Sequence, residues 1–377
     1  MDTMTGFKRT HYCGTLRAEN IGETVSVCGW IQRQCDLGGL IFADLRDRTG
    51  LLQLAFGDDT DKEIFEKASS LRSEYVVAAV GTVRERESKS KKIPTGDIEV
   101  FVTELRILSK AETPPFEIVD GTKANEMLRL KYRYLDLRRP ELQKNLMFRH
   151  KVAKITRDYF DENGFLEIET PTLIKSTPEG ARDFLVPSRI HPGKFYALPQ
   201  SPQIYKQLCM VAGFDRYMQI ARCYRDEDLR ADRQPEFTQI DLEMSFVTME
   251  DVLSIGEGYI RRVFQDAMGI DIGPLPRMTY QEAMEKYGSD KPDTRYGMEI
   301  FNLADEVKNC GFAVFTNALQ AGGGVHGICA KGAFKALSRK ELDKLIDHVK
   351  GIGGKGQVAG AKGADGSLAS SVNKILT

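Results

Sequence analysis

Residues 217–246 hold the side chains whose types and spacing could bind and activate a substrate. Two runs of strand-like alternation flank a polar segment at 226–236, which predicts an antiparallel hairpin with a long charged loop. On the second strand, one face is polar and carries Phe237, Gln239, Asp241, Glu243 and Ser245. The other face is mostly apolar and carries Thr238, Ile240, Leu242, Met244 and Phe246. We expect the apolar face to pack inward and the polar face to border a cleft.

The polar face suits a ligand that carries phosphate and a flat base. Arg225 and Glu227 are two residues apart and point the same way, and Arg233 and Phe237 follow the loop. A guanidinium presents a rigid fork of donors to phosphate oxygens, and a phenyl ring can stack on a base. The alternative is a hairpin of solvated ion pairs that contribute little to stability.

The residues YRDEDLRADRQPEFTQID, at 224–241, resemble motif 2 of the class II aminoacyl-tRNA synthetases, and most closely that of the bacterial aspartyl-tRNA synthetases. The resemblance implies that Arg225 and Glu227 are catalytic. Arg225 would bind the α-phosphate of ATP, Glu227 the adenine side and Arg233 the γ-phosphate. Phe237 would stack on adenine beside Gln234, and Asp241 would hold the substrate ammonium.

The activity implied by the resemblance is that of an aspartate–tRNA ligase. L-Aspartate attacks the α-phosphorus of ATP, and the aspartyl group then passes to tRNA(Asp), with tRNA(Asn) an open second acceptor. Such a transfer needs positioning and charge neutralisation more than covalent help. Mg²⁺ is expected to bridge the phosphates.

An amino-acid pocket is expected upstream of the hairpin. Ser201 is a good N-cap and Pro202 a good first helical residue, so Gln203 and Lys206 share one helix face. By resemblance, Glu179 in the loop at 176–188 faces the substrate ammonium, and Ser201, Gln203 and Lys206 line the pocket. Lys206 would pair with the side-chain carboxylate of aspartate and disfavour a neutral amide. A solvated lysine is the alternative.

The N-terminal part has the order of strands and helix of an OB-fold. Strands are predicted at 24–33, 40–47, 51–56, 75–85 and 98–108, with a helix at 61–71. Residues that could contact single-stranded RNA are Arg33, Phe42, Arg46, Gln53, Arg84, Arg86 and Glu99. The resemblance makes this an anticodon-binding domain, with Arg33, Phe42, Gln53, Arg84 and Glu99 at the anticodon. Position 35 is Cys where the family tends to have Arg. A core Phe42 and solvated arginines are the alternative.

We therefore expect a multidomain α+β protein. The expected domains are an OB-fold at 1–112, a proline-marked linker at 113–125, a class II core at 126–288 and the start of an α+β insertion domain at 289–377. The helix expected at 142–162 and the strand after Gly164 resemble motif 1, which implies a homodimer. Gly351, Gly353 and Gly356 spell G-x-G-x-x-G after an expected helix at 339–350, which argues against a dinucleotide site.

Composition restricts the remaining choices. Lys and Arg total 53 against 54 Asp and Glu in 377 residues, so RNA binding must come from local patches. The first residues lack an apolar stretch, and no apolar run is long enough to span a membrane. The seven cysteines have no C-x-x-C spacing, which favours reduced thiols. These features predict a cytoplasmic protein without a membrane segment.

The family's motif 3, with its Mg²⁺ ligands, does not follow in this sequence, and Gly213–Arg216 cannot replace it. We expect a fragment of a longer synthetase whose metal ligands lie outside it. Two rivals stay open: an inactive tRNA-binding module that retains the OB-fold, and an asparaginyl or lysyl relative. The loop TPEGARD and Lys206 disfavour the second.

Overall fold

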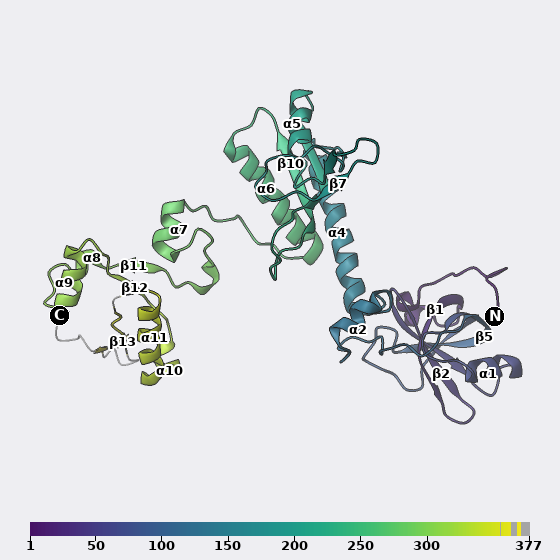
Figure 1. The fold of residues 1–377 in the computed structure, drawn as a ribbon. Helices are drawn as coiled ribbons and strands as arrows, with labels where there is room; N and C mark the ends of the chain where they lie inside the picture. Colours follow the sequence, from purple (N-terminus) through teal and green to yellow (C-terminus); the bar gives the residue numbers. More distant parts are fainter. Residues whose placement is uncertain (355, 363–367, 371–377) are drawn as a thin grey trace. The chain divides into compact units, whose positions relative to one another are not determined.

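The computed structural model describes residues 1–354, 356–362 and 368–370, which form two compact units, Met1–Gly273 and Pro274–Thr377 (Figure 1). The expected domain boundary after residue 288 lies inside the second unit. The reason is that α7 (Tyr280–Tyr287) packs against β11 (Ile300–Asn302). Residues 355, 363–367 and 371–377 of the expected insertion domain lie outside the described part.

The first unit begins with a closed five-stranded barrel in the order β1-β2-β3-β5-β4. Its strands are β1 (Thr24–Asp36), β2 (Ile41–Asp47), β3 (Gly50–Phe56), β4 (Val76–Glu85) and β5 (Ile98–Ser109). The helix α1 (Lys62–Ser69) joins β3 to β4, and Asp61 caps it by accepting from the backbone N–H of Glu63 and Ile64. Two short 3-10 turns precede the barrel, Cys13–Thr15 and Ala18–Asn20. The predicted OB-fold is confirmed.

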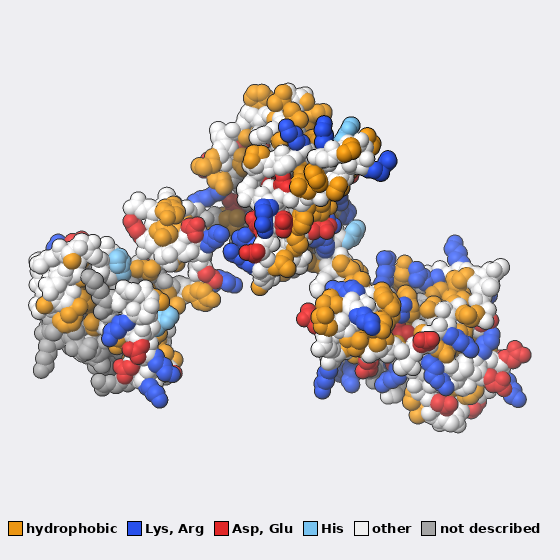
Figure 2. All heavy atoms as spheres, viewed as in Figure 1, with side chains coloured by type: hydrophobic (Ala, Val, Ile, Leu, Met, Phe, Trp, Pro, Cys, Tyr) orange, Lys and Arg blue, Asp and Glu red, His pale blue; other side chains and the backbone are white. Residues whose placement is uncertain are grey.

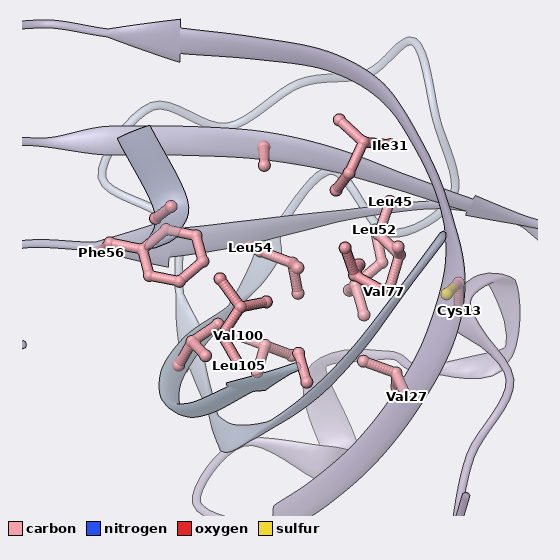
Figure 3. Packing of buried hydrophobic residues seen from close by; sticks show 14 of the residues in the cluster. Cys13, Val27, Ile31, Leu45, Leu52, Leu54, Phe56, Val77, Val100 and Leu105 are labelled. Atoms are coloured by element: carbon pink, nitrogen blue, oxygen red, sulfur yellow. The ribbon is translucent and has the colours of Figure 1, made fainter. Parts of the chain in front are cut away.

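Alternating apolar residues fill the barrel. Val27 and Ile31 from β1 meet Leu45, Leu54 and Val100 from three other strands, and all are fully buried (Figure 3). Full burial of one such side chain stabilises the fold by roughly 1.5–3 kcal/mol. The interior is therefore a packed core, and ligands can reach only the outer face.

Arg46 is not available to RNA, so that expectation was wrong. Its guanidinium donates to both carboxylate oxygens of Glu74 at 2.7 and 2.8 Å, and both side chains are almost fully buried. Glu74, whose φ is +65°, also accepts from Arg138 at 2.8 Å. Arg138 in turn lies 5.0 Å from the ring of Trp30. This cluster fixes the segment around Arg138 to the barrel.

The rest of the first unit contains a sheet in the order β10-β9-β6, a separate two-stranded sheet of β7 and β8, and helices that contact the larger sheet. Its elements are α2 (Glu126–Lys131), α3 (Arg133–Asp136), α4 (Pro140–Glu162), β6 (Leu166–Glu167), β7 (Leu185–Pro187), β8 (Phe195–Ala197), α5 (Gln203–Val211), β9 (Arg216–Tyr224), β10 (Glu236–Met244) and α6 (Met249–Val263). A π-type turn, Phe264–Met268, continues α6. The strand expected after Gly164 shortens to the two residues of β6.

The predicted apolar back of the hairpin is confirmed at Leu242 and Met244, but not at Ile240, which is 37% exposed, or at Phe246. Leu242 and Met244 pack on a cluster that contains Phe160 of α4 and Met218 of β9. Phe246, placed on the same face by alternation, is instead 98% exposed. The strand ends at Met244, and the chain turns at Phe246 with φ +56°, so its side chain leaves the inner face.

The second unit consists of short elements in the described residues. Besides α7 and β11 they are α8 (Ala304–Val307), α9 (Ala313–Gln320), β12 (His326–Ile328), α10 (Ala333–Ala336), α11 (Arg339–Gly351), β13 (Gly360–Lys362) and β14 (Leu368–Ser370), with a 3-10 turn at Thr294–Tyr296. The glycine motif follows α11, as expected, and not a strand. None of the described helices is long and apolar enough to cross a membrane.

Candidate functional site

The hairpin β9–β10 brings the predicted polar side chains onto one surface. The strands pair antiparallel, with Phe237 opposite Cys223, Asp241 opposite Gln219 and Glu243 opposite Tyr217. Because side chains alternate along each strand, these six residues share a face. Along β10, Phe237 and Asp241 are separated by roughly 14 Å at about 3.4 Å per residue. The face is therefore long enough for a nucleotide at one end and an amino acid at the other.

A hollow of about 360 Å³ lies at the Phe237 end of this face. All five predicted ATP-binding residues line it: Arg225, Glu227, Arg233, Gln234 and Phe237. The guanidinium carbon of Arg225 is 5.0 Å from the centre of the Phe237 ring, and Arg233 pairs with Glu227 at 3.7 Å. Arg225 lies against the Phe237 ring and Arg233 lines the same hollow, an arrangement able to bind a phosphate and a base together.

A second hollow of about 340 Å³ joins the hairpin loop to the loop that follows Glu179. It is lined by Gly180, Ala181, Arg182, Asp226, Glu227, Asp228, Arg230 and Arg233. The backbone N–H of Asp226 donates to the carbonyl of Arg182 at 3.0 Å, which closes the two loops on each other. The sequence reasoning missed Arg230 and Asp228, since nothing in their spacing separates them from solvated loop charges.

At the other end of the face, Lys206 lies between two carboxylates. Its ammonium donates to Asp241 Oδ1 at 2.9 Å and lies 3.4 Å from Glu243. Burial acts to lower the pKa of Lys206, but the hydrogen bond and charge of Asp241, aided by Glu243, raise it above its ordinary value. Burial raises the pKa of the Asp241 carboxyl, against the effect of Lys206. The second oxygen of Asp241 is buried without a hydrogen-bond donor from the described residues.

Glu179 and Ser201 meet beside this pair. The Ser201 hydroxyl donates to Glu179 at 2.5 Å, and Thr177 donates to the other carboxylate oxygen at 2.9 Å. Ser201 is therefore not the helix cap that was expected: Pro202 occupies the cap position, and α5 begins at Gln203. Gln203 is half-buried one turn before Lys206. The structure thus brings together Glu179, Ser201, Lys206 and Asp241, with Gln203 one helical turn from Lys206, and their roles stay predictions.

The pocket floor contains a hydrogen-bonded set that sequence reasoning missed. The side-chain carbonyl of Gln219 accepts from the Tyr217 hydroxyl at 2.7 Å and from the Thr170 hydroxyl at 2.9 Å. The Cys223 thiol donates to Gln239 at 3.3 Å. Alternation along β9 could have identified Tyr217, Gln219 and Cys223, because they share the face of Arg225.

The outer face of the barrel gathers the residues predicted to meet RNA bases, although Gln53 and Glu99 are almost fully buried in the free chain. Glu99 accepts from Gln53 at 2.8 Å and from Arg84 at 2.8 Å, so one carboxylate joins three strands. Arg33 pairs with Asp44 at 3.3 Å, next to the half-buried Phe42 on the same face. A missed residue, Phe101, lies under the guanidinium of Arg84 at 4.5 Å. The alternation of Glu99 and Phe101 along β5 would have indicated it.

Among the described residues, no three His, Cys, Asp or Glu side chains form a group that could hold a metal ion. Mg²⁺ at a nucleotide is usually held by one or two carboxylates and the phosphates, so this finding does not bear on the Mg²⁺ expected from the resemblance. No residue is assigned to it.

Comparison with known families gives three matches. Residues 125–343 match the family described as tRNA synthetases class II (D, K and N), and residues 25–108 match an OB-fold nucleic acid binding domain. Residues 315–377 match a GAD domain. The class II match covers more than half of the chain.

Relatives with established names agree with these matches. The chain is 59% identical over its whole length to an aspartate–tRNA ligase of Ruminiclostridium cellulolyticum, of which it covers 64%. It is also 59% identical to an aspartate–tRNA(Asp/Asn) ligase of Lachnoclostridium phytofermentans, of which it covers 63%. The chain thus spans a little under two thirds of the length of these relatives.

Among solved structures, the asparaginyl-tRNA synthetase of Pyrococcus horikoshii complexed with asparaginyl-adenylate is similar in fold. The TM-score is 0.65 at 24% identity, with 79% of this chain and 70% of that chain covered. This likeness confirms the class II synthetase fold that the hairpin predicted.

Proposed function

We infer, from the premise that this chain belongs to the class II tRNA synthetases (D, K and N), that its polar hairpin face binds ATP and L-aspartate. The observation that carries the proposal is the buried carboxylate of Asp241. It shares Lys206 with Glu243 and keeps one oxygen without a donor in the part of the chain described. An unpaired buried acceptor is costly, so the site favours a ligand that brings a cation.

The ammonium group of an aspartate molecule would supply that cation, and its side-chain carboxylate would meet the ammonium of Lys206. Its ammonium would donate to Asp241 and to Glu179, whose carboxylate is held by Ser201 and Thr177. Its side-chain carboxylate would pair with Lys206, whose charged form is favoured by two carboxylates against the effect of burial on its pKa. An asparagine side chain would leave the ammonium facing a neutral amide, so aspartate is preferred.

ATP would occupy the hollow at the other end of the face. Arg225 would bind the α-phosphate, Arg233 the γ-phosphate, and Phe237 would stack on the adenine, with Glu227 and Gln234 at its edge. Charge that develops at the α-phosphate as the aspartate carboxylate attacks would be stabilised by Arg225. Pyrophosphate leaves in line, and the adenylate then passes its aspartyl group to the terminal ribose of tRNA.

The barrel would hold the tRNA at its unpaired bases. Support comes from the match to an OB-fold nucleic acid binding domain and from the outer face that joins Arg33, Phe42, Gln53, Arg84 and Glu99. Phe42 offers a stacking surface and Gln53 a donor and acceptor for a base edge. tRNA(Asp) is the proposed substrate. tRNA(Asn) is a second acceptor for the Lachnoclostridium relative by name and is the alternative here.

A homodimer is also proposed, through the surface that resembles motif 1. Apolar side chains on α4 and around β6 are about half exposed: Leu146, Met147, Phe148, Leu166 and Leu173. A second copy of the chain could cover them. The seven cysteines form no disulfide, which suits the reducing cytoplasm as the proposed location.

The proposal is tested by calorimetric titration of the chain with a non-hydrolysable aspartyl-adenylate analogue and, as the matched control, the asparaginyl analogue. We expect saturable binding of the first and at least about 10²-fold weaker binding of the second, the scale for an unpaired buried charge. Equal affinity for both would contradict the assigned role of Lys206. Binding of tRNA without binding of either analogue would favour a module that only binds RNA.

A further inference from the structure

Two arginines from distant parts of the sequence lie on one tyrosine ring at the edge of the barrel. The guanidinium carbon of Arg9 is 3.8 Å from the centre of the Tyr12 ring, and that of Arg48 is 5.0 Å away. Both arginines are exposed, and the ring between them is half-buried. Cation–π contact with one ring holds the two charges in a defined position.

The backbone builds this arrangement by fixing the N-terminal arm to the turn between β2 and β3. The N–H of Cys13 donates to Asp47 at 2.7 Å, and the N–H of Gly14 donates to the Thr49 hydroxyl at 2.8 Å. A Cβ atom at position 14 would lie 2.1 Å from the Thr49 carbonyl oxygen, so only glycine fits. The Cys13 side chain belongs to the barrel core (Figure 3). Arg9 and Arg48 are therefore brought together by the fold.

The charges of this arginine pair are not compensated by the protein. Asp47, the acid next to Arg48 in sequence, already accepts from the backbone N–H of Cys13 and from the N–H and hydroxyl of Thr49. Neither guanidinium forms an ion pair with any carboxylate of the described residues. Two like charges held close together repel each other. An anion bound to both would relieve that repulsion.

We propose that Arg9 and Arg48 bind phosphates of the RNA whose bases lie on the barrel face. The guanidinium fork matches phosphate oxygens, and β2 leads from Phe42 to Asp47, directly before Arg48. That path is roughly 20 Å at about 3.3 Å per residue, so the contact falls on backbone several nucleotides from the stacked bases. Acidic and basic side chains are otherwise intermixed on the visible face of the chain (Figure 2). The inference rests on the proposed binding of tRNA by the barrel.

The test measures how the affinity for a tRNA(Asp) transcript depends on salt, between roughly 50 and 200 mM KCl. The double variant Arg9→Gln/Arg48→Gln should reduce the slope of log K against log salt by about 0.7–0.9 for each lost phosphate contact. The control is Arg72→Gln on the same barrel, because the Arg72 guanidinium donates to the carbonyls of Ser69 and Leu71. The control should keep the wild-type slope.

Two further variants distinguish a loss of charge from a disturbance of the fold. Arg48→Gln alone leaves the arm and Arg9 in place and should remove about half of the change in slope. The variant Arg9→Lys/Arg48→Lys keeps both charges and should restore most of the slope. If the wild-type chain binds tRNA but the Gln variants keep the wild-type salt dependence, this inference is overturned and the proposed function stands. A wild-type chain that binds no tRNA would overturn the proposed function and this inference with it.

Discussion

Lys206 and Asp241 form a buried ion pair in which the acid is only half satisfied. The ammonium lies 2.9 Å from one carboxylate oxygen, and the other oxygen has no donor from the described residues. Glu243 shares the same ammonium at 3.4 Å, so the group carries one more negative than positive charge. A buried excess of negative charge is unfavourable until a cationic ligand arrives. The pair therefore limits the stability of the free protein and, under the proposed function, favours a cationic ligand.

Replacing Lys206 should destabilise the fold. In Lys206→Met, Asp241 and Glu243 face each other without a cation, and only about 11% of the Lys206 side chain is exposed. We expect the free energy of unfolding in urea to fall by about 3–5 kcal/mol. The double variant Lys206→Met/Asp241→Asn should recover at least about 1 kcal/mol of that loss. Strictly additive losses in the double variant would show that the pair does not interact.

The same pair predicts a dependence of stability on alkaline pH. The pKa of Lys206 is raised in the folded state above its ordinary value of 10.5, so folding favours the protonated amine. Its stabilisation is complete below pH 10.5 and is lost as pH rises through the folded pKa. The difference in unfolding free energy between wild type and Lys206→Met should therefore narrow above that pH. A constant difference up to alkaline unfolding would argue against a charged Lys206.

Arg225 should be required for activation of the amino acid. In a full-length protein, Arg225→Ala should lower aspartate-dependent pyrophosphate exchange roughly 10²- to 10³-fold, the scale of one preorganised charge contact. Arg222→Ala is the matched control, because Arg222 belongs to the same strand and pairs with Glu236 on the outside. An exchange rate equal to that of wild type would remove Arg225 from the mechanism.

The cysteines should differ sharply in reactivity. Cys35 and Cys329 are exposed, whereas Cys13 and Cys223 are buried. Burial, aided by the charge of Asp241, raises the pKa of Cys223 to about 11, so little thiolate forms at neutral pH. Peptide mass spectrometry after brief iodoacetamide treatment should find the exposed pair alkylated and the buried pair intact until denaturant is added. Equal labelling of Cys35 and Cys223 in the native chain would contradict this burial.

Substitution of Glu74 should reduce the stability of the barrel more than substitution of an exposed acidic residue. Glu74→Gln leaves the buried guanidinium of Arg46 without its counter-charge, and about 3–5 kcal/mol of stability should be lost. Trp30 is the only tryptophan in the chain and contacts Arg138, so its fluorescence reports the transition. Glu104→Gln removes a half-exposed partner of Arg106 and should cost less than about 1 kcal/mol. Similar losses in both variants would contradict the difference in burial.

The features that depend on local periodicity, the barrel strands and the polar face of β10, were predicted correctly. The five barrel strands follow from alternation of apolar and polar residues, because one side of each strand is buried. The polar face of β10 follows from the same rule. The two hollows could not be predicted from periodicity, since they depend on how the loop after Glu179 meets the hairpin loop.

The failures come from contacts between distant segments and from chain turns. Arg46 alternates with Phe42 along β2 and looked available for RNA, but Glu74 from another segment covers it. Ser201 has the residue type of a cap, yet its hydroxyl donates to Glu179. Phe246 follows the alternation of β10, but the backbone reverses there. Each of these outcomes depends on a residue or angle outside the local pattern.

If the barrel binds RNA as proposed, the two hydrogen bonds that Glu99 accepts influence which base can reach it. In the free chain the Glu99 carboxylate accepts hydrogen bonds from Gln53 and Arg84, and the Arg84 guanidinium also lies over the Phe101 ring. A base that reaches the nearly buried Glu99 carboxylate must displace these donors and supply its own. A base without a donor at that point leaves a bare anion behind, which costs about 1–3 kcal/mol or more. Under the proposed function, the barrel face therefore favours a base that replaces the hydrogen bonds it displaces at Glu99.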